Sequence, residues 1–249
     1  MNQDQVIILG CRVDILNTAQ CLDKITELVD ARKTAHVITL NAEIVYQAQT
    51  NRELLGIINE AAVVTPDGIG IVWGGRQLGY VIPERVSGID LLYSICETAP
   101  TRKWKIYLLG SSPGVADEAG GQLKARFPGL HICGSHHGYF QPSEVASIIA
   151  DINHSQADIL VVSLGAPKQE IWISQNKDDL AVPVCIGVGG SLDVIAGNKK
   201  RAPGWMIRMN LEWLYRLLAE PSRWRRQLAL PKFVLLILQS KYRRVSIPD

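Results

Sequence analysis

Short apolar runs alternate with longer amphipathic stretches along most of the chain. The runs are rich in β-branched residues, and most are continuously apolar rather than alternating between apolar and polar positions. Strands of this kind are buried on both faces, as in a parallel sheet that is covered by helices. The predicted strands span residues 36–40, 62–65, 105–110, 130–134, 158–165 and 183–190.

The stretches between these runs have the length and spacing of amphipathic helices. Asn17 or Thr18 is a suitable N-cap for the first of them. The predicted helices span residues 18–32, 43–60, 113–127, 143–154 and 167–178. Regular alternation of strands and helices predicts a doubly wound α/β fold with a mainly parallel sheet.

Charge is distributed unevenly along the chain. Residues 1–198 carry 14 Lys and Arg against 21 Asp and Glu, whereas residues 199–249 carry 12 against 3. The basic tail interleaves tryptophans with leucine-rich stretches, which is typical of helices that lie in the headgroup layer of a membrane. Its longest apolar run, 233–238, is far shorter than the roughly 20 residues of a spanning helix. We expect an α/β core over 1–198 and a basic helical appendage over 199–249; a helix pair packed on the sheet is the alternative.

The cysteines and the first residues point to a cytoplasmic protein. The five cysteines form no CxxC pair and no close Cys/His cluster, so neither a zinc site nor a disulfide framework is expected. No basic leader precedes the first apolar run, so the sequence predicts no secretory signal. His136 and His137 lack a third ligand at a suitable spacing, and no metal is expected there.

One acidic residue, Asp67, is a candidate for substrate contact. It follows the predicted strand 62–65 and lies beside two glycines, with no cationic residue before Arg76. Open parallel sheets bind ligands at the carboxyl ends of their strands, which favours a role in binding or catalysis. The alternative is that Asp67 caps a helix beginning near Gly68.

Other polar residues also follow predicted strands or lie in loops. Thr39 and Asn41 lie at the end of a predicted strand. The alternatives are that Thr39 is an ordinary strand residue and that Asn41 caps the helix that follows. Arg85 lies in a loop that contains proline and glycine, where its guanidinium could bind phosphate or simply face solvent.

Two further strand ends carry candidate groups. The turn 110–114 has free N–H groups that could hold an anion, but it lacks the complete dinucleotide or P-loop pattern. Lys168, Gln169 and Glu170 fall on the first turn of a predicted helix, so at least one of them is expected to point into the cleft. A capping role for Glu170 is the alternative.

Nine sequence blocks together resemble the WecG/TagA/CpsF glycosyltransferases. They occur in the family's order and spacing from about Val6 to Gln227, and the combination is far more specific than any one block. Leu192 departs from the pattern, because the family usually has Phe there; Asp193 beside it is retained. The blocks are TLNAE, TPDGIG, PERVSGID, YLLGSSPGVA, HHGYF, LGAPKQE, GVGGSLDVIAG, KRAPGW and LEWLYRLLAEPSRWRRQ.

The resemblance implies a fold and an activity. Family members have a Rossmann-like parallel sheet with a small helical and hairpin lobe. They transfer N-acetylmannosamine or its uronic acid from a UDP-sugar to N-acetylglucosamine on a polyprenyl diphosphate, with inversion, at the cytoplasmic leaflet. The product feeds teichoic acid or another surface polysaccharide. No cofactor or metal is implied, and this sequence has no DxD motif.

The resemblance also implies roles for individual residues. Asp67 matches the proposed general base, and an acid without a cationic partner stays basic enough to accept a proton. The appendage is expected to dock over the cleft of a membrane-associated monomer, and the core alone is expected to self-associate off the membrane. The residues that match the sugar and acceptor pocket are Thr39, Asn41, Arg85 and Gln169. Those that match contacts to the nucleotide are Tyr139 and Asp193, and those that match the leaving-group arginines are Arg216, Arg223 and Arg226.

Two functions from other classes remain open from the sequence. A doubly wound sheet alone would also suit a nucleotide-dependent oxidoreductase, although GVGGSL is a poor dinucleotide fingerprint. The basic, tryptophan-containing tail would also suit a non-enzymatic nucleic-acid binder, whose binding would weaken steeply with salt. Binding of NAD(P), or of single-stranded DNA in preference to anionic liposomes, would identify these alternatives.

Overall fold

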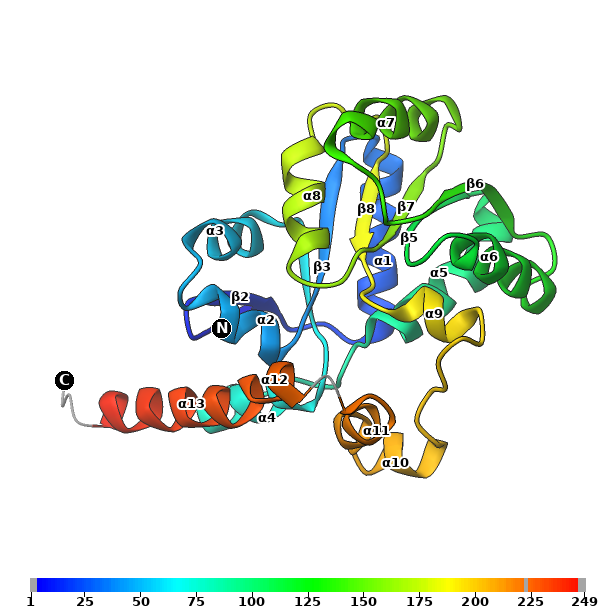
Figure 1. The fold of residues 1–249 in the computed structure, drawn as a ribbon. Coiled ribbons are helices and arrows are strands. Elements are labelled where there is room, and N and C mark those ends of the chain that lie inside the picture. The colour runs from blue at the N-terminus through cyan, green and yellow to red at the C-terminus, as the bar shows by residue number, and fades with distance from the viewer. Residues whose placement is uncertain (1–3, 222–223, 246–249) are drawn as a thin grey trace.

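The computed structural model describes residues 4–221 and 224–245. Its centre is a six-stranded sheet with the order β4-β3-β8-β7-β5-β6, in which each neighbouring pair is parallel (Figure 1). Each strand coincides within a few residues with a predicted one, so the Rossmann-like α/β fold is confirmed. The strands are β3 (Ala35–Leu40), β4 (Val63–Pro66), β5 (Lys105–Gly110), β6 (His131–His136), β7 (Ile159–Ser163) and β8 (Val184–Gly187).

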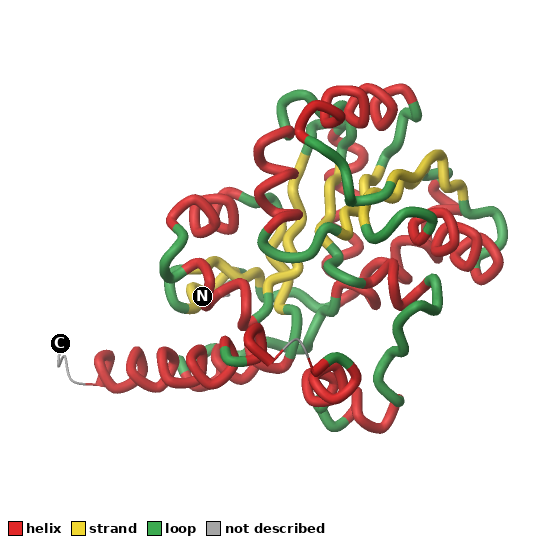
Figure 2. Tube along the Cα trace, in the orientation of Figure 1, coloured by secondary structure: helices red, strands yellow, loops and turns green. Residues whose placement is uncertain are grey.

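Successive residues of a strand face opposite layers of helices, which explains why the strands are apolar throughout. Ile106 and Leu108 of β5 pack into one hydrophobic cluster, and Tyr107 and Leu109 pack into another. Figure 2 shows the sheet enclosed by helices. The first cluster includes residues of α1 (Thr18–Ala31), α5 (Gly88–Arg102), α6 (Val115–Arg126) and α9 (Ser191–Ile195). The second includes residues of α7 (Val145–His154), which follows the 3-10 turn η1 (Pro142–Glu144), and of α8 (Lys168–Asn176).

Four of the five predicted helices are confirmed within a few residues, and the prediction of one helix over 43–60 is wrong. That stretch forms two helices, α2 (Ala42–Ala48) and α3 (Arg52–Glu60). The chain breaks between them because the Asn51 side chain accepts a hydrogen bond from Leu54 N, at 3.0 Å, and begins a new helix.

A small lobe precedes and flanks one edge of the sheet. Strands β1 (Gln5–Ile8) and β2 (Cys11–Asp14) form an antiparallel hairpin, and their apolar residues share a cluster with α4 (Ile69–Gln77). The two turn residues, Leu9 and Gly10, have φ of 49° and 84°, the left-handed conformation that tight hairpins require. The hydrophobic pattern does not predict this hairpin, because a leucine occupies a turn position that Asn or Gly usually fills.

The described part of the C-terminal segment forms four helices, of which the last joins the core. Helix α13 lies alongside α4 and contacts α2, and its Phe233 and Ile237 are fully buried in the cluster of the small lobe (Figure 1). The boundary at 198/199 stays a prediction. Within the described residues, no helix combines the length and apolar composition that a bilayer crossing requires. The four helices are α10 (Gly204–Arg208), α11 (Glu212–Ala219), α12 (Trp224–Gln227) and α13 (Ala229–Val245).

Candidate active site

Three neighbouring strands of the sheet end at one place, and two cavities meet there. Asn41 follows β3, Asp67 follows β4, and Gly189 lies just beyond β8. The Asp67 N–H donates to Leu40 O at 2.8 Å, which fixes the end of β4 against the end of β3. All three of these positions line a cavity, as expected at the carboxyl edge of a parallel sheet.

Asp67 is not a helix cap. Gly68 occupies the N-cap position of α4, and no side chain caps that helix. Gly68 has φ of 85°, a left-handed conformation that turns the chain sharply after the strand. The Asp67 side chain is therefore left to face the two cavities, which both include it in their walls.

The environment of Asp67 raises the pKa of its carboxyl group. Burial raises this pKa to about 6, while Arg216 and Arg85 act to lower it and Glu212 acts to raise it. The expectation that Asp67 lacks cationic neighbours holds along the sequence and fails in the structure. Both arginines are, however, engaged by another carboxylate.

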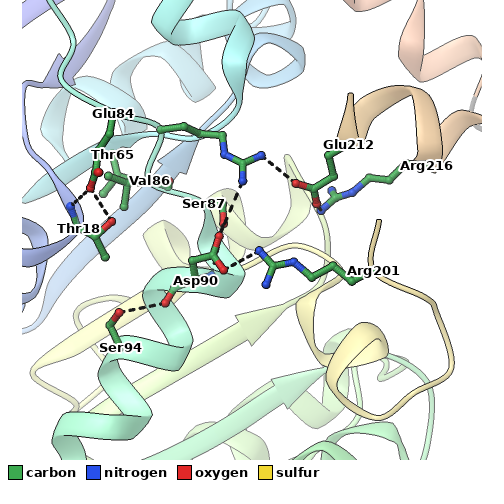
Figure 3. Close-up of polar contacts among 11 residues, drawn as sticks. Thr18, Thr65, Glu84, Val86, Ser87, Asp90, Ser94, Arg201, Glu212 and Arg216 are labelled. Atoms are coloured by element: carbon green, nitrogen blue, oxygen red, sulfur yellow. Dashed lines mark hydrogen bonds and ion pairs between the residues drawn. The ribbon is translucent and has the colours of Figure 1, made fainter. Parts of the chain in front are cut away.

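That carboxylate is Glu212 at the start of α11. Its Oε2 accepts from Arg85 Nη1 at 2.8 Å, and its Oε1 accepts from Arg216 Nη2 at 2.5 Å (Figure 3). Arg216 lies one helical turn further along α11, whereas Arg85 belongs to the loop before α5. The contact between Arg85 and Glu212 joins the C-terminal segment to the core beside Asp67.

A second acid extends the same network. Asp90 on α5 accepts from Arg201 Nη2 at 2.6 Å and from Ser87 Oγ at 2.5 Å, and it lies 3.8 Å from Arg85 Nη2 (Figure 3). Arg201 precedes α10, so this contact is a further link between the C-terminal segment and the core.

Thr39 and Gln169 fix the loop that follows β8. The Thr39 hydroxyl donates to Gly187 O at 2.9 Å, and Gln169 Oε1 accepts from Gly189 N at 3.0 Å. Gln169 Nε2 donates to Glu170 Oε1 at 2.8 Å, so Glu170 orients Gln169, and no side-chain cap is found on α8. Burial raises the pKa of Glu170 to about 6. Both Thr39 and Gln169 line the smaller cavity.

Asn41 and Arg226 line both cavities. Asn41 caps α2 by accepting from Ile44 N at 3.0 Å, so the capping interpretation is confirmed, and the residue also faces the site. Arg226 of α12 donates through Nε to Glu43 Oε1 at 2.7 Å, which ties a second part of the C-terminal segment to α2.

The two cavities differ in character. The smaller, about 150 Å³, is polar, and the larger, about 770 Å³, is lined mainly by apolar side chains between α4 and the C-terminal helices. The cationic residues of the polar cavity are Lys199, Lys200, Arg201, Arg216 and Arg226. The apolar cavity is lined by, among others, Ile69, Trp73, Trp213, Leu217, Leu230 and Phe233. The residues common to both walls are Asn41, Glu43, Asp67, Glu212, Arg216 and Arg226.

The structure thus brings together most of the residues that the sequence singled out. Tyr139 and Asp193 are not among the described residues that line either cavity. Tyr139 is 73% exposed, and Asp193 accepts from Ser111 Oγ at 2.9 Å in the first turn of α9. Arg223 lies outside the described residues. The residues that gather at the cavities are Thr39, Asn41, Asp67, Arg85, Gln169, Arg216 and Arg226.

Sequence reasoning missed several residues of the site. Glu212 is one of few acids in a basic tail, four residues before Arg216, and this spacing on a helix was the available signal. Lys199 and Lys200 belong to the basic tail but were not assigned to the site. Across residues 4–221 and 224–245, no group of three or more His, Cys, Asp and Glu side chains is arranged to hold a metal ion.

Comparison with known proteins identifies the family of this chain. The model of the glycosyl transferase WecG/TagA/CpsF family matches residues 6–246. Three similar proteins are each named N-acetylglucosaminyldiphosphoundecaprenol N-acetyl-beta-D-mannosaminyltransferase. The one from Bacillus spizizenii is 38% identical over 222 residues, 89% of this chain and 84% of the relative. Those from Bacillus subtilis and Staphylococcus aureus are each 34% identical, over 86% and 96% of this chain and 82% and 94% of their own lengths.

These names are those of transferases, and they support neither an oxidoreductase nor a nucleic-acid binder. The family match extends through the sheet, both cavities and the C-terminal helices. The chain belongs to the WecG/TagA/CpsF family of glycosyl transferases.

Proposed function

We propose that the protein transfers N-acetylmannosamine, or a related sugar, from a UDP-sugar to N-acetylglucosamine carried on a polyprenyl diphosphate. The observation that carries this proposal is the position of Asp67, where a polar, cationic cavity meets a larger apolar one. A charged nucleotide-sugar suits the first cavity, and the lipid side of the acceptor suits the second. The names of the relatives, which specify this acceptor and this sugar, support the same assignment.

The proposed reaction inverts the anomeric centre. Asp67 takes the proton from the acceptor hydroxyl as that oxygen attacks C1 of the donor sugar, and the bond from C1 to the UDP oxygen breaks on the opposite face. General base catalysis contributes on the order of 10²–10⁴-fold to such a step. The raised pKa of Asp67, about 6, suits a carboxylate that must accept a proton near neutral pH.

The UDP leaving group acquires negative charge as the bond breaks. Arg216 and Arg226, which line the polar cavity, are assigned to this charge, together with Arg223 from the family resemblance. Thr39, Asn41, Arg85 and Gln169 are assigned to the sugar and acceptor. Tyr139 and Asp193 remain candidates for the nucleotide.

We further propose that the protein works at the cytoplasmic face of the membrane. The C-terminal helices expose large apolar side chains, and the same segment is strongly basic, so it suits an anionic lipid surface. The product would enter teichoic acid or another surface polysaccharide. The exposed apolar residues include Trp205, Met209, Trp213, Leu218 and Trp224.

A donor screen tests this function. The purified full-length protein is incubated with individual UDP-sugars and a short-chain lipid diphosphate that carries N-acetylglucosamine. The masses of the products are then measured by mass spectrometry. We expect addition of one N-acetylhexosamine from one UDP-sugar and none with Asp67→Asn. Absence of transfer from every UDP-sugar, with binding of NAD(P) instead, would overturn the proposal.

A further inference from the structure

Glu212 occupies a central position among the charges of the site. Its side chain is buried, with the residue 8% exposed, and each of its two carboxylate oxygens accepts a hydrogen bond from a different guanidinium group (Figure 3). Arg85 comes from the core and Arg216 from the same helix as Glu212. Burial alone raises the pKa of Glu212, but the two arginines outweigh it and hold the pKa below its ordinary value. Glu212 is therefore ionised at neutral pH.

Asp67 shares the cavity walls with Glu212 and Arg216, yet its contacts differ. Among the described residues Asp67 forms no ion pair, whereas Glu212 forms two. The backbone of Gly88 acts, like the two arginines, to lower the pKa of Asp67. Asp67 and Glu212 are thus both close to Arg85 and Arg216, and each arginine forms an ion pair with Glu212.

We propose that Glu212 is a positioning residue for the transfer reaction. By holding Arg85 and Arg216 in ion pairs, it keeps both guanidinium groups off Asp67 and leaves that carboxylate unpaired for the acceptor proton. The proposal rests on the function proposed above. It adds to that function a residue of the C-terminal segment that acts on the base rather than on the substrate.

Charge balance around Asp67 supports this role. Without the Glu212 carboxylate, two uncompensated positive charges would remain beside Asp67 and favour its ionised form, so that it becomes a weaker base. An arginine released from Glu212 would also be free to pair with Asp67 directly. Either event lowers the capacity of Asp67 to take a proton.

The other charged groups of the two cavities are largely paired with one another. Glu43 of α2 binds Arg226 at 2.7 Å, Lys199 lies 3.3 Å from Glu220, and Asp90 binds Arg201 at 2.6 Å. Among the described residues that line the cavities, Lys200 is the remaining charged group, and it lines the polar cavity only. Glu212 is therefore the carboxylate whose loss directly alters the charges that act on Asp67.

Carboxyl-carbon NMR of the full-length protein, without substrate, measures the titration of Asp67 directly. The Asp67 signal is identified by its loss in Asp67→Asn. In Glu212→Gln we expect the Asp67 midpoint to move to lower pH by about one unit, and in Glu212→Asp we expect it to stay near the wild-type value. Glu27→Gln is the matched control, because Glu27 pairs with Lys24 on the exposed face of α1.

Arg216→Gln provides a test with the opposite sign. Removing one positive charge beside Asp67 should move its midpoint to higher pH. An unchanged or higher midpoint in folded Glu212→Gln overturns the proposal. Should Glu212→Gln not fold, as judged by circular dichroism, an unchanged or lower midpoint in Arg216→Gln overturns it.

Activity provides the second measurement. In Glu212→Gln we expect kcat with a soluble acceptor to fall about tenfold, with the acid limb of kcat/KM moved to lower pH and UDP affinity retained. A purely structural role would instead lower kcat and UDP affinity together and leave the acid limb in place. If the wild-type protein transfers no sugar, the proposed function fails, while the NMR titration still decides the role of Glu212.

Discussion

Phe233 of α13 packs directly onto the backbone of α4 at Gly74. A Cβ atom added at Gly74 would lie 2.9 Å from Phe233 Cζ, closer than real Cβ contacts come. The glycine thus allows the two helices to approach, and Phe233 is fully buried as a result. The same helix also supplies residues to the wall of the apolar cavity.

Phe233→Ala should therefore destabilise the protein by about 3–5 kcal/mol, since it removes a buried aromatic ring and leaves a cavity. Chemical denaturation monitored by circular dichroism measures this. Leu235→Ala is the control on the same helix, because Leu235 is 58% exposed, and we expect it to change the free energy of unfolding by less than about 0.5 kcal/mol. Equal losses in the two variants would contradict the packing of α13.

Asp67→Asn should lower kcat by on the order of 10²-fold or more, because the amide keeps the shape of the side chain and cannot accept the acceptor proton. UDP binding, measured by calorimetry, should persist. Near-wild-type turnover would eliminate Asp67 as the base.

The same substitution should stabilise the folded protein at alkaline pH. The folded pKa of Asp67 is about 6, above its ordinary 3.8, so folding favours the protonated form. That contribution is present below pH 3.8 and is lost as pH rises through about 6. Because the carboxylate faces a cavity, we expect a gain of about 1–2 kcal/mol for Asn at pH 8 and a smaller gain at pH 4.5. Thermal melts at both pH values, with exposed Asp23→Asn as control, measure it; equal gains at both would argue against the raised pKa.

Arg226→Gln should reduce kcat/KM with a soluble acceptor by about 10–100-fold, because one charge-stabilising donor is lost at the polar cavity. Arg226→Lys should recover only part of the rate, since an ammonium lacks the planar fork of donors. Arg208→Gln on the exposed face of α10 is the control. A full wild-type rate for Arg226→Gln with the soluble acceptor would contradict a role for this arginine at the leaving group.

Transfer should continue in excess EDTA. Among the described residues, five cationic side chains line the polar cavity and can balance the diphosphate, and the sequence has no DxD motif. Initial rates are compared after dialysis against the chelator. Loss of activity that Mg²⁺ or Mn²⁺ restores would contradict this.

Most of the sheet can be predicted from the sequence, because strands buried on both faces are apolar without interruption. The helices that the hydrophobic pattern does not predict contain residues that are unfavourable in helices. Helix α4 contains three glycines, which are poor helix formers, and α5 contains Pro100. Both are held in place by packing rather than by propensity, and this packing depends on residues far away in the chain.

The candidate site could be predicted only in part. Asp67, Asn41 and Gln169 follow strands, and strand ends of a parallel sheet meet at one edge whatever the details. The pairing of Arg85 with Glu212 joins residues 127 positions apart, and no local pattern contains it. The family resemblance supplied Arg216 and Arg226, but their carboxylate partners become evident only in three dimensions.

The apolar cavity has one wall from residues 41–73 and 85, and the other from residues 210–234. A ribosome synthesises the first wall well before the second, and a domain generally folds as a unit. A nascent chain that ends before α11 contains the residues of the sheet and Asp67, but it lacks Glu212 and the second wall of the cavity. Synthesis itself thus delays a complete active site until the residues of the second wall, up to residue 234, have left the ribosome.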